Sequence, residues 1–309
     1  MILHSIIKVC MNFKRGSVKM TYLLSPKIDF VFKRIFGNEK HPDILISFLN
    51  AVMKPKDLIK SVKIINSDIE KEHIEDKYSR LDIKAVTNKG EYINIEIQVK
   101  NEYNMIKRSL YYWSKMFESQ IVEGDNYNKL AKTVCINILD FKYLKNNNFH
   151  NAYRLKEINT NEELTDTIEL HFIEIPKLRR LDNSEEISDM LEAWVAFIQS
   201  PDSEIVERLE MSKREIKEAK TELVRMSADS KERYMYEKRK ESILEKVSLI
   251  ESAEQKGIEK GLREGLKEGE NKKAIEIAQN AINNNLDDNT IQVITGLSLD
   301  KIKELRNTK

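Results

Sequence analysis

Residues 79–99 contain the pattern that most restricts the fold of this chain. In "EYINIEIQV", every second side chain from residue 93 is a β-branched aliphatic one and the residues between are polar. This is the periodicity of a strand with one apolar and one polar face. The preceding segment "SRLDIKAVT" is also strand-like, and Asn88-Lys89-Gly90 separates the two. A three-residue hairpin loop favours a left-handed residue where Gly90 stands, so we predict a β-hairpin.

The loop also predicts the pairing of the two strands. If Thr87 faces Glu91, then Asp82 lies opposite Glu96, and both project from the same face as Gln98. A slip of one residue would break this arrangement, because it moves every side chain to the other face. Two explanations of the polar face stay open. It faces water, which is the usual case, or it forms a reaction site.

The reaction-site hypothesis rests on the two acids. Neighbouring carboxylates repel each other, and a divalent cation compensates them. Mg²⁺ takes oxygen ligands, commonly one or two carboxylates with water and substrate phosphate. Here the ligands would be Asp82, Glu96 and the backbone carbonyl of Ile97, while Gln98 positions the attacking water. Such an ion lowers the pKa of bound water and neutralises phosphate charge, which would serve phosphodiester hydrolysis.

The segments around the hairpin predict an α/β domain over residues 20–200. The run "KTVCINILDF" is continuously apolar, as in a central strand buried on both faces. Apolar periodicity and Pro or Gly signals define the other elements. We expect helices over residues 26–36, 41–53, 105–121 and 185–199, and strands over 62–69, 132–141 and 169–178.

The composition changes after Pro201. Residues 203–256 contain no Gly or Pro and are dense in Glu, Lys and Arg, which predicts solvated helices within a region of residues 201–270. From Gly257 to Gly269 a glycine recurs every fourth residue. Both close approach of another helix and a flexible linker are compatible with this stripe.

Residues 271–309 predict a small helical tail. Its size suits a helix-turn-helix, but no visibly basic recognition helix is present. Asp287 or Asp288 and Ser298 are expected N-caps. The expected core consists of Ile291, Ile294, Leu297, Ile302 and Leu305.

Composition sets broad limits on function. The chain has 309 residues with 52 Lys+Arg and 51 Asp+Glu, so its net charge neither supports nor excludes nucleic acid. The two cysteines cannot form a disulfide framework, which fits a reducing cytoplasm, and Cys135 is expected in the core. No apolar run approaches the ~18 residues that span a bilayer. "KRG" before Met20 is what a translated ribosome-binding site looks like, so residues 1–19 are expected to be a non-native extension.

Several segments in order resemble the Rpn family of recombination-promoting nucleases, also described as transposases, within the PD-(D/E)XK nuclease superfamily. The segments are "DFVFKRIFG", "LDIKA", "IEIQ", "KRSLYYWSKM" and "ADSKERYMYEKRKESILEK". The resemblance covers the chain from about residue 22 onward. It implies an α/β fold, namely a PD-(D/E)XK restriction-endonuclease-like core of a four-stranded mixed sheet flanked by helices, followed by a long helical C-terminal region.

The resemblance also implies roles for residues of the hairpin. It places metal-binding acids at Asp82 and Glu96, and Gln98 where the superfamily usually has Lys. Gln can orient water but adds no positive charge. Lys84 and Lys100 lie on the polar face and could supply that charge, and Lys100 is also a candidate phosphate contact.

In the first helix, Asp29 matches the family's early acid, which would orient a metal-bound water. The alternative is a helix-end residue placed near the positive end of the helix dipole. Lys33 could contact DNA, although an exposed helical lysine is usually only solvated.

In the helix after the hairpin, Arg108 and Tyr112 lie four residues apart and share a face. Arg108 could bind a phosphate bidentately, or it could form a salt bridge with Glu102 or Glu118. The neighbouring aromatic residues, including Tyr111, are expected to pack in the core, with a base-stacking platform as the alternative.

The implied function is a DNA endonuclease that uses Mg²⁺ or Mn²⁺ and acts in recombination or on mobile DNA. A homodimer would allow both strands to be cut. The rival hypothesis is a catalytically degenerate scaffold that self-associates or binds partners through its C-terminal helices. Motifs of other hydrolases, such as H-E-x-x-H and G-x-S-x-G, do not occur in the sequence.

Overall fold

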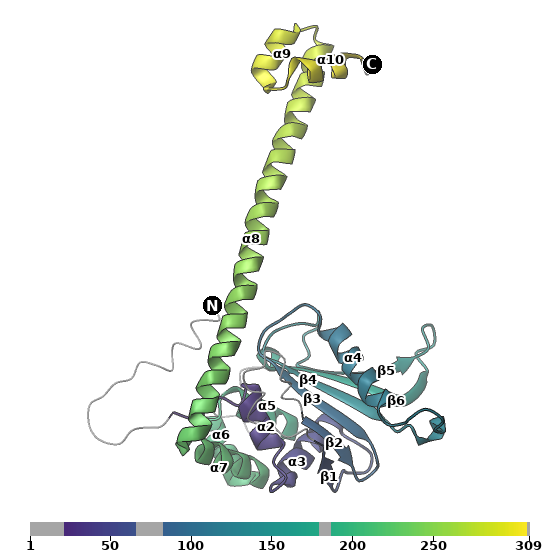
Figure 1. Ribbon diagram of the computed structural model, residues 1–309, viewed down its shortest axis with the longest axis vertical. Coiled ribbons are helices and arrows are strands. Elements are labelled where there is room, and N and C mark those ends of the chain that lie inside the picture. Colours follow the sequence, from purple (N-terminus) through teal and green to yellow (C-terminus); the bar gives the residue numbers. More distant parts are fainter. Residues whose placement is uncertain (1–21, 66–82, 179–186, 308–309) are drawn as a thin grey trace, which may run out of the picture. The chain divides into compact units, whose positions relative to one another are not determined.

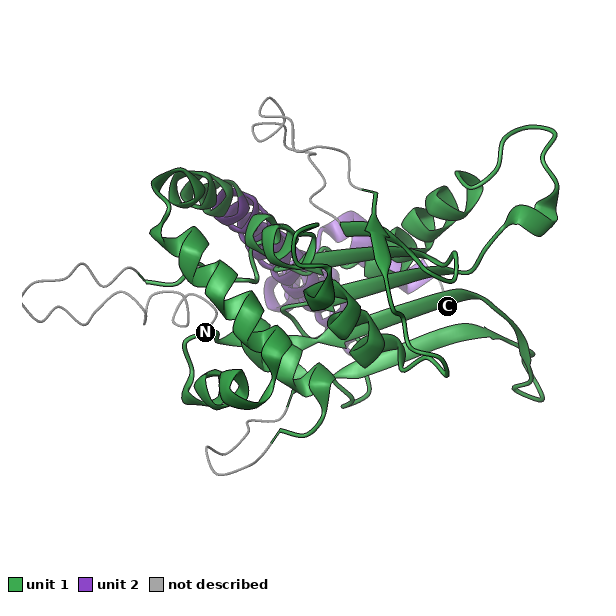
Figure 2. Ribbon diagram, turned by 90° about the horizontal axis from the view of Figure 1, so that it is seen from below, with its two compact units in different colours: residues 1–242 green, residues 243–309 purple. Residues whose placement is uncertain are grey.

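The computed structural model describes residues 22–65, 83–178 and 187–307 (Figure 1). Asp82 and the extension 1–19 lie outside these ranges. The chain divides into two compact units, residues 1–242 and 243–309 (Figure 2). The first unit holds the sheet and the helices that flank it.

The sheet of the first unit is mixed and has the strand order β1-β2-β3-β4-β6-β5. Strands β3, β4 and β6 run parallel, while β1, β2 and β5 pair antiparallel to their neighbours (Figure 1). The strands are β1 (Val62–Ile64), β2 (Ile83–Thr87), β3 (Tyr92–Gln98), β4 (Thr133–Leu139), β5 (His150–Lys156) and β6 (Glu163–Glu174). The family resemblance implied four strands, and β5 in particular has no counterpart among the predicted elements.

The hairpin of β2 and β3 has the predicted loop and register. Gly90 has φ +80° and its N–H donates to the carbonyl of Thr87 at 2.9 Å. Ile83 pairs with Ile95, and Lys84 with Asn94. The register is therefore confirmed for the described part of β2. The predicted pairing of Asp82 with Glu96 lies outside the described residues.

Both faces of the sheet are covered. All seven residues of β4 are buried, as predicted for a central strand. Helix α4 (Met105–Glu118) covers one face, where Met105 and Met116 pack with Cys135, Leu139 and other apolar side chains. The burial of alternate residues, such as Ile95 and Ile136, shows that the other face is also shielded from water.

Four further helices pack beside the sheet. Helix α2 (Asp29–Phe36) contacts β3 and helix α3 (Pro42–Met53) contacts β1. The rings of Phe36, Phe48 and Trp194 pack edge to face at centroid distances of 5.1–6.5 Å. Trp194 belongs to α5 (Met190–Gln199), and α7 (Arg214–Ala228) contacts α2, α3 and α5. Helix α6 (Glu204–Ser212) links α5 to α7.

Some predicted boundaries shift. Helix α2 begins at Asp29 rather than at residue 26, and it ends before Gly37 as predicted. Strand β1 ends at Ile64, while residues 66–69 of the predicted strand lie outside the described ranges. Helix α5 begins later than predicted because Asp189 caps it, accepting from the N–H of Leu191 at 2.7 Å.

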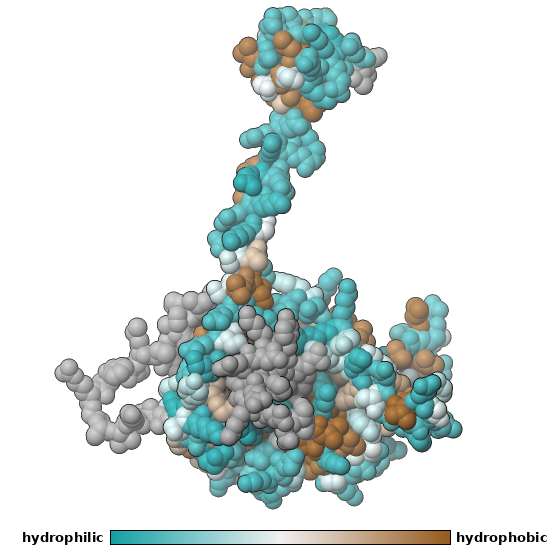
Figure 3. Space-filling view, in the orientation of Figure 1, coloured by the Kyte–Doolittle hydropathy of each residue, from teal (hydrophilic) through white to brown (hydrophobic). Residues whose placement is uncertain are grey.

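Helix α8 (Ser230–Asn283) begins inside the predicted charged region of residues 201–270 and continues past its end. Its surface is largely hydrophilic (Figure 3). A Cβ added at any glycine of the stripe, from Gly257 to Gly269, would meet no atom within 4 Å. Among the described residues, no helix is long and apolar enough to cross a membrane.

The second unit contains the predicted helical tail. Helices α9 (Asp288–Thr295) and α10 (Leu299–Asn307) follow α8, and Asp287 caps α9. The core includes Ile291 and Ile302, as predicted. Ile294 is 50% exposed, so its assignment to the core was wrong.

Candidate active site

The polar face of β3 is not a solvated face. Asn94 and Glu96 are 4% and 3% exposed, although both lie on the polar side of the alternating pattern. Helix α4 covers this side of the strand, which alternation alone could not reveal. A carboxylate is seldom buried this deeply unless it is paired, so Glu96 marks a functional or structural ion-pair site.

Glu96 has two polar neighbours among the predicted site residues. The Gln98 amide donates to Oε1 of Glu96 at 2.5 Å, and the Arg108 guanidinium forms an ion pair with the same oxygen. Arg108 also lies 3.6 Å from Glu102 and 5.5 Å from the ring centroid of Tyr112. These contacts join β3, its following loop and α4 into one cluster.

Of the two salt bridges predicted for Arg108, the one with Glu102 is observed. Glu118 pairs with Lys115 instead, at 3.4 Å. The pairing with Glu96 was not predicted. A guanidinium held between two carboxylates keeps a fixed orientation, and its planar donors suit a phosphate as well as a carboxylate.

Asn137 of β4 adds a neighbour that sequence reasoning missed. It pairs directly with Glu96 in the parallel register and is 2% exposed. Its amide donates to Oγ of Ser109 at 2.9 Å and to the carbonyl of His171 at 3.0 Å. The single amide in the apolar run "TVCINIL" was the signal available in the sequence. These bonds tie α4 to the sheet beside Glu96.

Asp29 is held from a distant part of the chain. Arg239 of α8 donates to Oδ1 at 2.9 Å and Oδ2 at 3.0 Å through its Nε, and its Nη2 binds Oδ2 as well. Oδ1 also accepts from the N–H of Phe30 at 2.8 Å, at the start of α2. The predicted helix-end position is thus observed, together with a bidentate ion pair that was not expected. This pair raises the pKa of Arg239.

The predicted lysines occupy different environments. Lys33 is 6% exposed, so the expectation of an exposed helical lysine was wrong. The reason is that α2 is buried on nearly all sides, with Arg34 as its most exposed residue. Lys100 is half-buried just after β3, and Lys84 is exposed on β2. Lys27 and Asp140 form another pair at 2.9 Å next to the site.

That pair adjoins Gln98 through the backbone, because the N–H of Asp140 donates to the carbonyl of Gln98 at 2.9 Å. Burial raises the pKa of Asp140, against the opposing effect of Lys27. Lys27 is therefore a further cation near Gln98, the position where the superfamily usually has Lys.

A comparison with known protein families gives a match. The model of the family described as PD-(D/E)XK nuclease family transposase matches residues 26–253. The chain belongs to this family. No curated protein and no solved structure gives a significant match to the chain.

Membership of the PD-(D/E)XK family indicates a nuclease, and nucleases of this family generally use divalent metal ions. The mixed sheet with flanking helices agrees with a PD-(D/E)XK core. The matched range includes β3, α4 and Arg239, so the contacts of Glu96 and Asp29 lie within the PD-(D/E)XK region.

The donors of this PD-(D/E)XK site suit a hard cation. Within the described ranges, no group of three His, Cys, Asp or Glu could hold a metal ion. Of the predicted metal ligands, the carboxylate of Glu96 and the backbone carbonyl of Ile97 are described, and both supply oxygen. Mg²⁺ binds in this way, through one or two carboxylates with water and phosphate. Asp82, the other predicted acid, lies outside the described ranges.

The opposite face of the sheet carries a second buried polar cluster. Glu169 is 2% exposed and accepts from His171 at 2.7 Å, Lys132 at 2.8 Å and Arg154 at 2.7 Å. His150 lies 2.9 Å from His171. His171 pairs with Ile136, which precedes Asn137 in β4, so this cluster faces away from Glu96.

Two of these groups have displaced pKa values. Burial of Glu169 opposes its ionisation, but hydrogen bonds from His171 and Lys132 outweigh it and lower its pKa to about 2. Burial and the neighbouring His171 and Lys54 lower the pKa of His150 to about 4. The cluster therefore combines an ionised Glu169 with a neutral His150 at pH 7.

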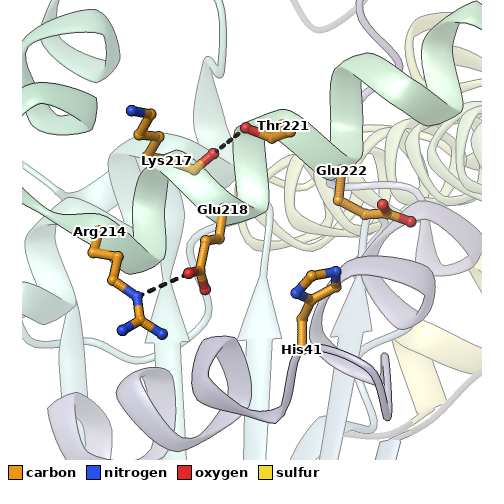
Figure 4. Close-up of a pocket in the computed structure, with 6 residues that line it drawn as sticks. All are labelled: His41, Arg214, Lys217, Glu218, Thr221 and Glu222. Carbon is orange, nitrogen blue, oxygen red and sulfur yellow. Dashed lines mark hydrogen bonds and ion pairs between the residues drawn. The ribbon is translucent and has the colours of Figure 1, made fainter.

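A pocket of about 330 Å³ lies elsewhere, between α7 and the residue that precedes α3 (Figure 4). Arg214 donates to Glu218 at 2.8 Å along one turn of α7 (Figure 4). None of the described candidate site residues lines this pocket. Its lining residues are His41, Arg214, Lys217, Glu218, Thr221 and Glu222.

Proposed function

We propose that this protein is a metal-dependent DNA endonuclease that hydrolyses phosphodiester bonds. The observation that carries the proposal is the burial of Glu96 on β3 with Gln98 and Arg108 bound to the same oxygen. Family membership supports a nuclease, and a buried, ion-paired carboxylate on the central hairpin gives that nuclease a candidate site.

Asp82, Glu96 and the backbone carbonyl of Ile97 would hold the ion, with Mg²⁺ or Mn²⁺ as the candidates. Bound there, the ion would lower the pKa of water and neutralise charge on phosphate. Gln98 would orient the attacking water through its amide. Its hydrogen bond to Glu96 fixes that amide, so Gln98 needs little reorganisation when water binds.

Arg108, Tyr112 and Lys100 are the proposed contacts to DNA phosphate, and Lys33, which was predicted as a fourth, would act at longer range. The fixed guanidinium of Arg108 could exchange a carboxylate for a phosphate oxygen without leaving α4. Lys33 is buried, so its role would be electrostatic rather than a contact at the surface.

Asp29 would orient a metal-bound water, as the family's early acid does. Its bond to the N–H of Phe30 and its ion pair with Arg239 fix the carboxylate for that task. The proposal extends to a cytoplasmic protein acting in recombination or on mobile DNA, and to a homodimer that cuts both strands.

The test is a plasmid-nicking assay with the full chain over a Mg²⁺ titration. Glu96→Gln keeps the size of the side chain and removes its charge, so nicking should fall at least about 100-fold. Asp82→Asn should have a similar effect. Glu118→Gln is the matched control, because Glu118 is an exposed acid on α4 whose partner is Lys115.

Mn²⁺ binding to each variant, followed by electron paramagnetic resonance, separates loss of the ion from loss of the fold. Folding is checked by circular dichroism. Nicking by Glu96→Gln and Asp82→Asn at the wild-type rate would contradict the proposal and favour a degenerate scaffold.

A further inference from the structure

Helix α4 carries an apolar stripe on the side that faces away from the sheet. Within the helix, Ile106 and Leu110 lie four residues apart on one side and Tyr111 follows directly, while Tyr103 lies two residues before the helix begins. All four are apolar and strongly exposed: Tyr103 72%, Ile106 46%, Leu110 42% and Tyr111 51%. Lys107 lies among them. The packing of α4 on the sheet does not use these side chains, because Met105 and Met116 serve that contact.

Tyr103 is held outward by an unusual backbone. Its φ is +59°, in the left-handed region, which is uncommon for a bulky residue and costs about 1–3 kcal/mol. The Asn101 side chain accepts from the N–H of Tyr103 at 2.7 Å and stabilises this conformation. The chain thus maintains a strained backbone at the point where an aromatic ring enters the solvent.

The stripe is continuous with the candidate active site. The ring of Tyr111 packs against that of Tyr112 at 5.7 Å, and Arg108 lies over the Tyr112 ring. Arg108 in turn binds Glu96. An occupant of the stripe would therefore extend toward the buried acid.

Charge and chemistry point to one kind of occupant. On α4, Arg108 pairs with Glu96 and Glu102 and Lys115 pairs with Glu118, while the exposed Lys107 places a positive charge beside the rings. Exposed rings combined with cations are the features that bind single-stranded nucleic acid, where bases stack on rings and phosphates meet cations. In a duplex the base faces are hidden, and apolar side chains reach them only by unstacking.

We infer that the stripe stacks with unpaired bases, so that the substrate is single-stranded or locally unpaired DNA. This inference rests on the proposed function and specifies its substrate class. Tyr103 lies before α4 and Tyr111 lies within it, so each ring would stack on a different base. The predicted packing role of Tyr111 in the core was wrong, because half of this residue is exposed.

The test compares binding of the full chain to a fluorescent dT20 oligonucleotide and to a 20-bp duplex, with Ca²⁺ in place of Mg²⁺ to suppress cleavage. The wild type should bind dT20 more tightly. Tyr103→Ala and Tyr111→Ala should each weaken dT20 binding about 5- to 30-fold, the range for loss of one stacked base. Tyr103→Phe should bind like the wild type, because it keeps the ring.

Tyr234→Ala is the control, since Tyr234 is 64% exposed on α8 and outside the stripe. Equal weakening on dT20 and duplex, or no weakening, would overturn the inference, while Mg²⁺-dependent plasmid nicking by the same samples would show that the proposed function stands. Absence of binding to either DNA together with absence of nicking would overturn both.

Discussion

Arg239 binds both carboxylate oxygens of Asp29 across 210 residues of sequence. The pair links the first turn of α2 to the third turn of α8, and both side chains are less than one-fifth exposed. A neighbouring contact also joins α8 to the segment before α2. The guanidinium of Arg233 lies 4.3 Å from the ring centroid of Tyr22 and donates to the backbone carbonyl of Tyr22. The beginning of α8 is therefore an integral part of the first unit.

Arg239→Ala is expected to destabilise the first unit by about 1.5–3 kcal/mol, because it leaves Asp29 without its bidentate partner. Arg239→Lys should recover only part of this loss, since an ammonium cannot donate in the same planar arrangement. Urea unfolding measures the effect. Arg225→Ala is the control, because its pair with Glu222 is more exposed and should contribute less than about 1 kcal/mol. Equal losses for Arg239→Ala and Arg225→Ala would refute this expectation.

Arg108→Ala is expected to cost on the order of 3 kcal/mol, because it removes the guanidinium from a carboxylate that is 3% exposed. Lys115→Ala, which removes an exposed cation from the same helix, should change the free energy of unfolding by less than about 0.5 kcal/mol. Denaturant unfolding of both variants provides the comparison. If Arg108→Ala is as stable as Lys115→Ala, the ion pair with Glu96 does not stabilise the fold.

The displaced pKa of His150 predicts a pH-dependent stability. The unfolded chain binds a proton at His150 near pH 6.5, whereas the folded chain does so only near pH 4. The unfolded state therefore gains protons first, and stability should fall as the pH decreases through this interval. We expect a loss of about 1–2 kcal/mol, allowing for the partial exposure of the ring.

Urea unfolding at several pH values between 7 and 4 measures this slope. His150→Gln should flatten it, while His41→Gln, at an exposed histidine, should leave it unchanged. Glu169 contributes in a lower interval, because its stabilising charge is lost only as the pH falls from about 4.5 toward 2. An identical slope in His150→Gln and the wild type would exclude His150 as the source.

Two glycines should respond to alanine with opposite signs. Gly90→Ala should destabilise the hairpin by about 1 kcal/mol, because φ +80° is unfavourable for any residue with a Cβ. Gly261→Ala should stabilise α8 locally by about 1 kcal/mol, since Gly261 is helical and a Cβ would meet no atom within 4 Å. Thermal unfolding tests the first change and amide hydrogen exchange over residues 257–269 tests the second. A higher melting temperature for Gly90→Ala, or faster exchange over residues 257–269 in Gly261→Ala, would contradict these expectations.

The sequence allowed the hairpin to be predicted because its cause is local. Gly90 supplies the left-handed residue of the loop, and the two-residue period then determines the register. Burial of Glu96 could not be predicted in the same way, because alternation does not tell whether a helix covers the polar face. The contact with Arg239 was also beyond local patterns, since it depends on the return of the chain 210 residues later.

Strand β5 escaped prediction for a different reason. Its sequence "HNAYRLK" mixes polar and apolar residues, and most of it is exposed at the edge of the sheet. A strand at the edge of a sheet pairs with a neighbour on one side only. Because most of β5 is exposed, its sequence does not need to alternate between apolar and polar residues. Lys33 was predicted to be exposed and is buried. A lysine in the sequence does not reveal that other elements surround its helix on most sides.

The attachment of α8 to α2 sets a practical limit on dissecting this molecule. A fragment that stops at the last residue of α7 would lack Tyr236, whose side chain is only 5% exposed in the full chain, and would remove the counter-charge of Asp29. Such a fragment would lose activity through damaged architecture, whatever role the distal helix plays. The shortest self-sufficient piece must therefore retain the opening turns of α8, through at least Ser242.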